Sequence, residues 1–299
     1  MRDGDALIGL APLLRRTRGP FRTIAEIGRG PGDYWDLLAA PGRREEVTVA
    51  VAAEIARRRR EWDLVLVDGL HAPGFGEALR DSGLRVADRP SLVSVEMPLP
   101  ESFDEYLAGL PRRRRSNLRR HLKRLDEGEF ELALVEPARL AEAVGRWHRM
   151  RAAWWSERGL EMEPLHGTEE FRSFMVDAVD ALSAVEAVEV TEMTRDGEPV
   201  GVSINLVDPR TFYVFLSAYD PSIASLGPGK IQTGEAIRSS IAVGRRSFDF
   251  TIGQDDYKYW FGAEDVSRPR QVVRSGSLRS RAAAGLGALR ERRRGGDEP

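Results

Sequence analysis

Hydrophobic positions in the first third of the chain change repeatedly between strand-like and helix-like spacing. Short apolar segments predict strands at 6–14, 21–27, 62–67 and 92–97. Between them, Val47, Val51 and Ile55 recur at helical spacing inside a helix predicted over 43–60, and residues 75–82 predict a shorter helix. Strands that alternate with helices in this way indicate an α/β unit.

A second and longer series of elements follows the segment Pro98-Leu-Pro100. Its amphipathic helices are predicted over 112–125, 138–159 and 169–182, and its strands over 130–135, 187–194, 200–207, 212–219 and 248–250. Asp196-Gly197 lies between two of these strands and predicts a hairpin turn. Two helices, three strands, a further helix and a strand in this order predict a mixed sheet flanked by helices.

A glycine-rich segment joins the last hairpin strand to the helix that follows it. Leu226-Gly-Pro-Gly-Lys230 comes first, and then Ile231, Ile237 and Ile241 recur at helical spacing. Glycine allows a sharp turn, and proline suits the first turn of a helix. The free N–H groups at this helix start, with Lys230 as a nearby point charge, fit a phosphate or pyrophosphate group.

Composition narrows the classes of function. The chain has 299 residues, of which 41% are hydrophobic and 31% charged, as in soluble globular proteins of one large or two ordinary domains. It contains no cysteine, which excludes disulfides and a cysteine acyl-enzyme. Its four histidines lack metal-ligand spacing, so we expect no metal. Residues 1–5 lack the apolar core of a signal peptide, and we expect a cytoplasmic protein with no transmembrane segment.

Charge is unevenly distributed, although the net charge is only −2. One predicted helix carries eight cations between Arg112 and Arg124 and no carboxylate. These cations either form a solvated face paired with acidic neighbours or hold the phosphates of a cofactor or of tRNA. Lysine is rare, because Lys123, Lys230 and Lys258 are the only three among 45 basic residues. Lys230 lies in the glycine-rich segment and Lys258 follows it, and a lysine at such positions indicates a need for a compact ammonium group that can be oriented.

The motifs from residue 219 onward occur in an order that resembles the GNAT-fold acyltransferases. They are Tyr219-Asp220-Pro221, Gly227-Pro228-Gly229, Gly244, Phe248-Asp249-Phe250, Gly253 and Tyr257-Lys258. The most similar subgroup is that of the cellulose-biosynthesis (CelD-type) or BioF2-like acetyltransferases, which are related to the FemABX aminoacyltransferases. The resemblance covers most of the chain, to about Gly262.

This resemblance implies an α/β (α+β) protein with a tandem GNAT-like acyltransferase fold, in which mixed sheets are flanked by helices. Residues 1–98 would form an N-terminal GNAT-like half, residues 99–274 the C-terminal acyltransferase domain, and residues 275–299 a polar tail that is a loose helix or disordered. In the subgroup, a strand and two helices precede the turn that residues 3–5 form here. We therefore expect the first half to be incomplete at its N-terminus.

The resemblance also implies a catalytic group, which consists of Lys258, Asp249 and Tyr257. In FemABX enzymes a lysine in an aromatic segment of this kind acts on the transferred acyl carbonyl, where one preorganised donor is typically worth about 3–4 kcal/mol. Asp249 would orient Lys258 or the acceptor amine. The alternatives are that Lys258 is a surface lysine in a C-terminal strand and that Asp249 caps a turn at a strand end.

Two further groups bind the substrates in this reading. The pyrophosphate of acyl-CoA would lie on the backbone of the helix start, at Gly227, Gly229, Lys230 and Ile231. The acceptor would contact His148, Arg151, Trp155 and Tyr219. The alternatives are that the aromatic side chains belong to the core and that the histidine is a structural hydrogen-bonding group.

The implied function is transfer of an acyl group, from acetyl-CoA or another acyl-CoA and without a metal, to an amine of a small-molecule, polysaccharide or envelope precursor. The amine would attack the thioester directly. Ser225-Leu-Gly-Pro-Gly229 only approximates the GNAT pyrophosphate signature Arg/Gln-x-x-Gly-x-Gly/Ala, so two other classes stay open. One is a FemABX-type aminoacyltransferase that binds aminoacyl-tRNA through the Arg112–Arg124 helix. The other is a catalytically inactive GNAT-fold binding protein.

Overall fold

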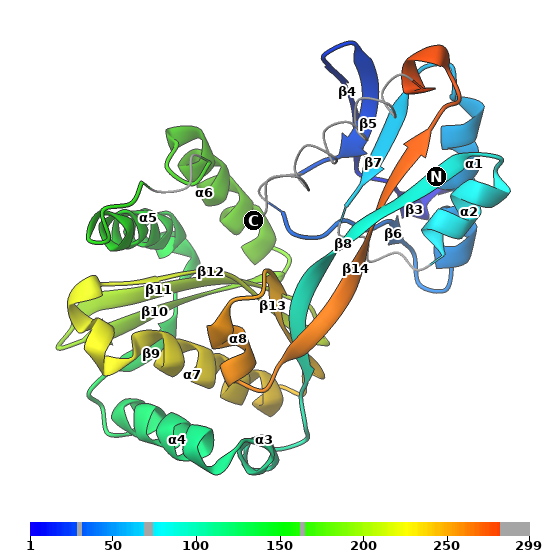
Figure 1. Ribbon diagram of the computed structural model, residues 1–299. Helices are drawn as coiled ribbons and strands as arrows, with labels where there is room; N and C mark the ends of the chain where they lie inside the picture. The colour runs from blue at the N-terminus through cyan, green and yellow to red at the C-terminus, as the bar shows by residue number, and fades with distance from the viewer. Residues whose placement is uncertain (29–31, 69–73, 162–164, 282–299) are drawn as a thin grey trace, which may run out of the picture. The chain divides into compact units, whose positions relative to one another are not determined.

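The computed structural model describes residues 1–28, 32–68, 74–161 and 165–281. The chain forms two compact units (Figure 1), one from residues 1–93 with the segment from residue 267 onward, the other from residues 94–266. Strands β8 (Arg85–Pro98) and β14 (Glu264–Arg274) contain the two points at which the chain passes from one unit to the other.

Four strands form the sheet of the first unit, in the order β4 (Leu13–Arg18), β5 (Phe21–Glu26), β7 (Leu64–Val67) and the end of β14. β5 and β7 are parallel, and the other two pairs are antiparallel. Helices α1 (Arg44–Arg57) and α2 (Phe75–Asp81) bury their apolar faces against these strands. Four two-residue strands pair as β1 (Arg2–Asp3) with β2 (Ala6–Leu7) and β3 (Gly9–Leu10) with β6 (Leu38–Ala39).

The sheet of the second unit contains the candidate site. Its strands follow the order β8, β13 (Ser247–Ile252), β12 (Thr211–Tyr219), β11 (Glu198–Val207), β10 (Val188–Arg195) and β9 (Glu131–Leu134). β12 and β13 form its parallel pair, which helix α7 (Pro228–Ala242) connects, and the remaining pairs are antiparallel. A parallel pair needs such a crossover helix, whereas β10 and β11 turn tightly at Asp196 and Gly197, both of which have positive φ.

Helices cover both faces of this second sheet (Figure 1). On one face, α5 (Leu140–Ser156) and α6 (Glu169–Ser183) pack Trp147 and Phe171 against strands β10 to β12. On the other face, α7 and α4 (Arg112–Asp126) pack Ile237 and Leu118 against Phe248. Short elements complete the unit: α3 (Phe103–Gly109), the 3-10 turns η1 (Pro137–Arg139) and η2 (Pro221–Leu226), and α8 (Asp256–Trp260).

The predicted fold class is confirmed, since a large mixed sheet is flanked by helices. Some details of the elements and of the division into units differ from the sequence prediction. The strand predicted over 6–14 is broken into β2, β3 and the start of β4, because Pro12 cannot donate to a sheet ladder. Residues 267–274, assigned above to the acyltransferase domain, belong to the first unit, where Val273 is part of the core. The predicted tail falls largely on residues 282–299, outside the described residues.

Among the described helices, none combines the length and the apolar character that crossing a membrane requires.

Candidate functional site

Strands β12 and β13 separate part of the way along their length. They pair at three positions, Thr211–Tyr213 with Ser247–Asp249, but β12 continues to Tyr219 and β13 to Ile252. Thr251 spans the widening gap, since its hydroxyl donates to the carbonyl of Val214 at 3.2 Å. Backbone groups along a strand point alternately to its two sides. The residues of β12 after Tyr213 therefore have backbone N–H and C=O groups that point toward β13 but do not pair with it, although β12 lies in the middle of the sheet.

Helix α7 begins at the open end of this gap, because it follows the C-terminal end of β12. Asp220 closes the intervening turn by accepting from the N–H of Ser222 at 2.8 Å. Gly227 precedes the helix with a φ of 74°, and a Cβ there would lie 2.4 Å from Cε1 of His121. Only glycine satisfies both conditions. A Cβ on Gly229 would meet Tyr219 at an ordinary 3.9 Å, so this first turn is open to close approach.

Helix α4 directs basic side chains at the same loop. Nδ1 of His121 lies 3.2 Å from the carbonyl oxygen of Leu226, and a guanidinium N–H of Arg124 donates to that oxygen at 3.4 Å. Burial and the nearby charge of Lys230 lower the pKa of His121. Nζ of Lys230 lies 5.1 Å from the ring centroid of Trp260. Arg124 and Lys230 add positive charge near the N-terminus of α7, which is the positive end of the helix dipole. This arrangement favours binding of an anion there.

Lys258 is buried in α8, with 3% of its surface exposed. Its ammonium donates to the carbonyls of Ile252 at 2.9 Å and Gly253 at 2.8 Å, and it lies 3.3 Å from a carboxylate oxygen of Asp255. Three protein acceptors thus face its three N–H donors. The alternative of a surface lysine in a strand is wrong, because Lys258 is a buried helical residue that holds the turn between β13 and α8.

Asp249 is 1% exposed on β13. One of its carboxylate oxygens accepts from the N–H of Thr251 at 2.7 Å, and Thr251 has a φ of 61°. The Asp249 charge is also among the causes that raise the pKa of Tyr213 to about 12, after burial and Asp208. The hydrogen bond from Thr251 to Asp249 is therefore the contact expected if Asp249 caps a turn at the end of the strand. This carboxylate stabilises the unusual backbone at which β13 leaves β12.

Tyr257 and Arg151 lie near each other although they come from α8 and α5. Burial first, and then the Asp255 carboxylate, raise the pKa of Tyr257 to about 12, and the charge of Arg151 acts in the opposite direction. Half of the Tyr257 surface is nevertheless exposed. The Arg151 guanidinium carbon lies 5.6 Å from the ring centroid of Trp155. Arg151 therefore lies over the ring of Trp155 and acts electrostatically on Tyr257.

His148 lies on the same face of α5 as Arg151 and Trp155, because the three positions follow helical spacing. Nε2 of His148 and Nε1 of Trp155 are buried and have no hydrogen-bond partner within the described part of the chain. Unpaired buried polar atoms are uncommon in folded proteins and mark places where a ligand or water binds. Tyr219, grouped with these residues in the sequence prediction, lies instead beside Gly229.

The sequence indicates the cations of α4 as possible phosphate ligands, but it does not identify which residues of this helix face the site. Arg114, Asn117, His121 and Arg124 are spaced by three, four and three residues and therefore form one stripe along the helix. Arg114 donates to the carbonyl of Tyr259 at 2.8 Å, and the side-chain oxygen of Asn117 is buried without a partner in the described structure. The spacing of these four residues along one side of the helix was the feature of the sequence that could have identified them.

Acidic and histidine side chains do not cluster as metal ligands do: among the described residues, no group of three or more could hold an ion.

Residues 112–259 match the family model described as the acetyltransferase (GNAT) domain. Among solved structures, FemX is similar with a TM-score of 0.63 and 12% identity, over 91% of this chain and 86% of that one. L-PGS from Bacillus licheniformis gives a TM-score of 0.58 and 12% identity, over 91% and 82%. The C-terminal domain of a putative lysylphosphatidylglycerol synthetase from Agrobacterium fabrum gives 0.55 and 12%, over 93% and 84%. At these identities the likeness shows the fold. No curated protein matches the sequence.

Proposed function

We propose that the GNAT domain of this protein is an N-acyltransferase that uses acetyl-CoA and acts on an amine of a small-molecule, polysaccharide or envelope precursor. One observation carries the proposal: the parallel strands β12 and β13 separate, and the N-terminus of α7 lies at the open end of the gap. The match of residues 112–259 to the acetyltransferase domain supports it.

The chemistry of the gap fits the parts of an acyl-CoA. Backbone N–H groups at the start of α7, with Lys230 and Arg124 close by, suit the pyrophosphate. The backbone of β12 after Tyr213 suits the amide-bearing chain of the thioester, which would add to the sheet edge as a strand does. Gly229 adds no side chain between the phosphates and the helix.

The reaction joins the amine nitrogen to the thioester carbonyl carbon and breaks the carbon–sulfur bond. The amine loses a proton and the departing thiolate gains one. Tyr257 is suited to donate that second proton, because a pKa of about 12 keeps its phenol protonated near neutral pH and its surface is half exposed.

Lys258 and Asp249 act as positioning residues in this proposal. Lys258 holds the carbonyls of Ile252 and Gly253, and Asp249 holds the N–H of Thr251, so together they define the end of β13. A direct role for Lys258 at the acyl carbonyl stays a prediction of the sequence resemblance. It requires the ammonium to exchange one of its three present partners for the substrate oxygen.

The acceptor side of the proposal rests on α5. His148 and Trp155 each present a buried ring nitrogen without a partner in the described structure, and Arg151 lies between them along the helix and near Tyr257. An acceptor with hydroxyl or carbonyl groups would supply the missing partners.

Thermal unfolding with and without acetyl-CoA tests the donor site. A ligand at 100 times its Kd stabilises the folded state by about 2.7 kcal/mol, which raises Tm by several degrees. We expect this shift in the natural protein and in Gly229→Asn, and its loss in Gly229→Asp, whose carboxylate would repel the phosphates. The two variants match in size and differ in charge. No shift at millimolar acetyl-CoA, or an equal shift in both variants, contradicts the proposal.

The exposed side of α4 supports a second candidate, an aminoacyltransferase that uses aminoacyl-tRNA. Four arginines of this helix are exposed: Arg112, Arg113, Arg119 and Arg120. If tRNA makes about six or more phosphate contacts there, its affinity falls about 10³-fold or more between 50 and 200 mM salt. Binding that weakens in Arg119→Gln but not in Arg149→Gln, an exposed arginine of α5, would favour this candidate. If neither acetyl-CoA nor tRNA binds, an inactive GNAT-fold binding protein is left.

A further inference from the structure

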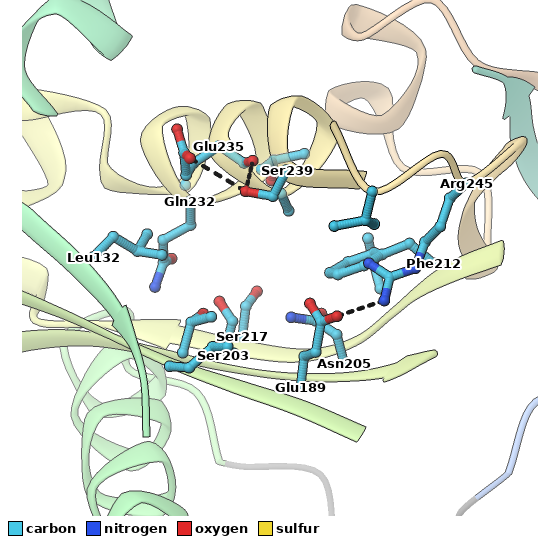
Figure 2. A pocket seen from close by; sticks show the side chains of 17 residues that line it. Leu132, Glu189, Ser203, Asn205, Phe212, Ser217, Gln232, Glu235, Ser239 and Arg245 are labelled. Carbon is cyan, nitrogen blue, oxygen red and sulfur yellow. Dashed lines mark hydrogen bonds and ion pairs between the residues drawn. The ribbon is translucent and has the colours of Figure 1, made fainter. Parts of the chain in front are cut away.

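A cavity of about 240 Å³ lies between α7 and the strands β9 to β12 (Figure 2). Its floor is the face of the sheet that α7 covers, and its roof is the body of that helix. Gly229 is the one of the four predicted donor-binding residues that lines it. The acyl-transfer proposal gives this cavity no role.

Gln232 is the central polar group of the cavity. It projects from α7 toward the sheet (Figure 2) and is 6% exposed. Both its amide oxygen and its amide nitrogen are buried without a hydrogen-bond partner in the described structure. Gly201 on β11 makes room for it, because a Cβ at that position would lie 2.7 Å from Nε2 of Gln232. A carboxamide enclosed in this way costs stability unless something in the cavity pairs with it.

Uncharged polar side chains from the sheet face Gln232 across the cavity. Ser203 and Asn205 on β11 are 5% and 4% exposed, and Ser217 on β12 lines the same space (Figure 2). Thr191 on β10 adds another hydroxyl. Hydroxyls and carboxamides both donate and accept hydrogen bonds, so the cavity offers both kinds of partner.

The charged residues at the edge of the cavity already pair with one another. Arg245 forms an ion pair with Glu189, and Glu235 pairs with Arg238 and accepts a hydrogen bond from Ser239 at 3.2 Å. A charged ligand would therefore find no unpaired opposite charge among these groups. This arrangement favours an uncharged ligand.

Apolar side chains complete the lining, among them Leu132, Phe212, Val214, Ala236 and Val243. A lining of both polar and apolar side chains suits a molecule whose hydroxyls form hydrogen bonds with the polar groups and whose C–H faces pack against the apolar ones. Pockets for drug-sized ligands begin at about 300 Å³, so this smaller cavity suits a single ring.

We propose that the cavity beneath α7 binds an uncharged, hydroxyl-rich molecule of the size of one sugar ring, a monosaccharide or a similar polyol, through the carboxamide of Gln232 and the hydroxyls that face it. The site shares Gly229 and strand β12 with the proposed donor site, but its central polar group, Gln232, lies beneath α7 on the face of the sheet. The proposal does not depend on the acyl-transfer activity.

Calorimetric titration with three probes, N-acetylglucosamine, glucose and myo-inositol, tests this proposal. We expect saturable binding of at least one probe to the natural protein. Gln232→Met keeps the length of the side chain and removes both polar atoms, so it should weaken binding about tenfold or more. Gly201→Ala should do the same by pushing the carboxamide aside, and it serves if Gln232→Met does not fold.

Ser240→Ala is the matched control. Ser240 lies on the same helix, and its hydroxyl is also buried without a partner in the described part of the chain, but it does not line the cavity. Binding should be unchanged in this variant. The proposal is overturned if none of the probes binds, which would leave ordered water as the occupant, or if Gln232→Met binds the probe as the natural protein does. The acetyl-CoA shift, measured in the same variants, should be retained, which separates this site from the donor site.

Discussion

At the scale of single residues, the buried ammonium of Lys258 is the least expected feature. Lysine is rarely buried, so a sequence reading expects it at the surface or at a catalytic centre. The structure instead surrounds Nζ with two backbone carbonyls and Asp255. Sequence showed that this lysine is unusual among the many arginines, but it could not show its partners, because they depend on how the chain turns at Gly253.

We predict that Lys258→Met destabilises the fold, because it leaves the carbonyls of Ile252 and Gly253 without a donor. A buried group left unpaired costs about 1–3 kcal/mol, so the two together should lower the free energy of unfolding by at least about 2 kcal/mol. Denaturant unfolding measures this. Lys123→Met, at an exposed ion pair of α4, should change stability by less than about 1 kcal/mol. Full stability of Lys258→Met combined with lost activity would return Lys258 to a direct catalytic role.

The pKa of His121 predicts a pH effect on stability. Since burial and Lys230 lower this pKa below its unfolded value of about 6.5, the unfolded chain binds more protons than the folded one just below that pH. The free energy of unfolding should therefore fall as pH drops from about 6.5 toward the folded pKa. His121→Gln should flatten this part of the profile. An unchanged profile would show that other groups cause it.

At the scale of elements, the contact between α4 and the loop before α7 determines the candidate anion site. The predicted order of helices and strands from residue 130 to residue 250 and the hairpin at Asp196-Gly197 followed from local patterns and are confirmed. The separation of β12 from β13 could not be predicted, because strand pairing is set by packing between distant segments. Nor could the role of His121, which depends on the missing side chain of Gly227.

Gly227→Ala tests this contact. Both the φ of 74° and the close approach of His121 oppose a side chain at this position. Gly244→Ala is the matched control, because Gly244 has a φ of 82° but no atom within 4 Å of the added Cβ. The control should cost about 1–2 kcal/mol for backbone strain, and Gly227→Ala at least about 1 kcal/mol more. The double variant with His121→Ala should recover that difference. Equal losses in the two single variants would exclude the steric contact.

At the scale of the whole molecule, the first unit is completed by a strand from the far end of the chain. β14 pairs with β7, and Val273 is fully buried in the core of that unit. The sequence prediction placed these residues in the acyltransferase domain, because a short segment with only two apolar residues, Val272 and Val273, does not indicate which sheet it joins.

Val273→Asp should therefore destabilise the first unit strongly, by about 3 kcal/mol or more, because a carboxylate replaces a core side chain. Val272→Asp, at the neighbouring and partly exposed position of the same strand, should cost much less. Circular dichroism during denaturant unfolding of the two variants measures the difference. Similar losses in both would argue against the placement of β14 in this core.

In the proposed function, the acyl donor lies in the gap between β12 and β13 with its phosphates at the start of α7. Amide hydrogen exchange with and without acetyl-CoA tests it most directly, because exchange reports protection peptide by peptide. We predict slower exchange with acetyl-CoA over the end of β12, residues 215–219, and over the first turn of α7, residues 229–231. Protection confined to other segments, or no protection at saturating acetyl-CoA, would contradict it.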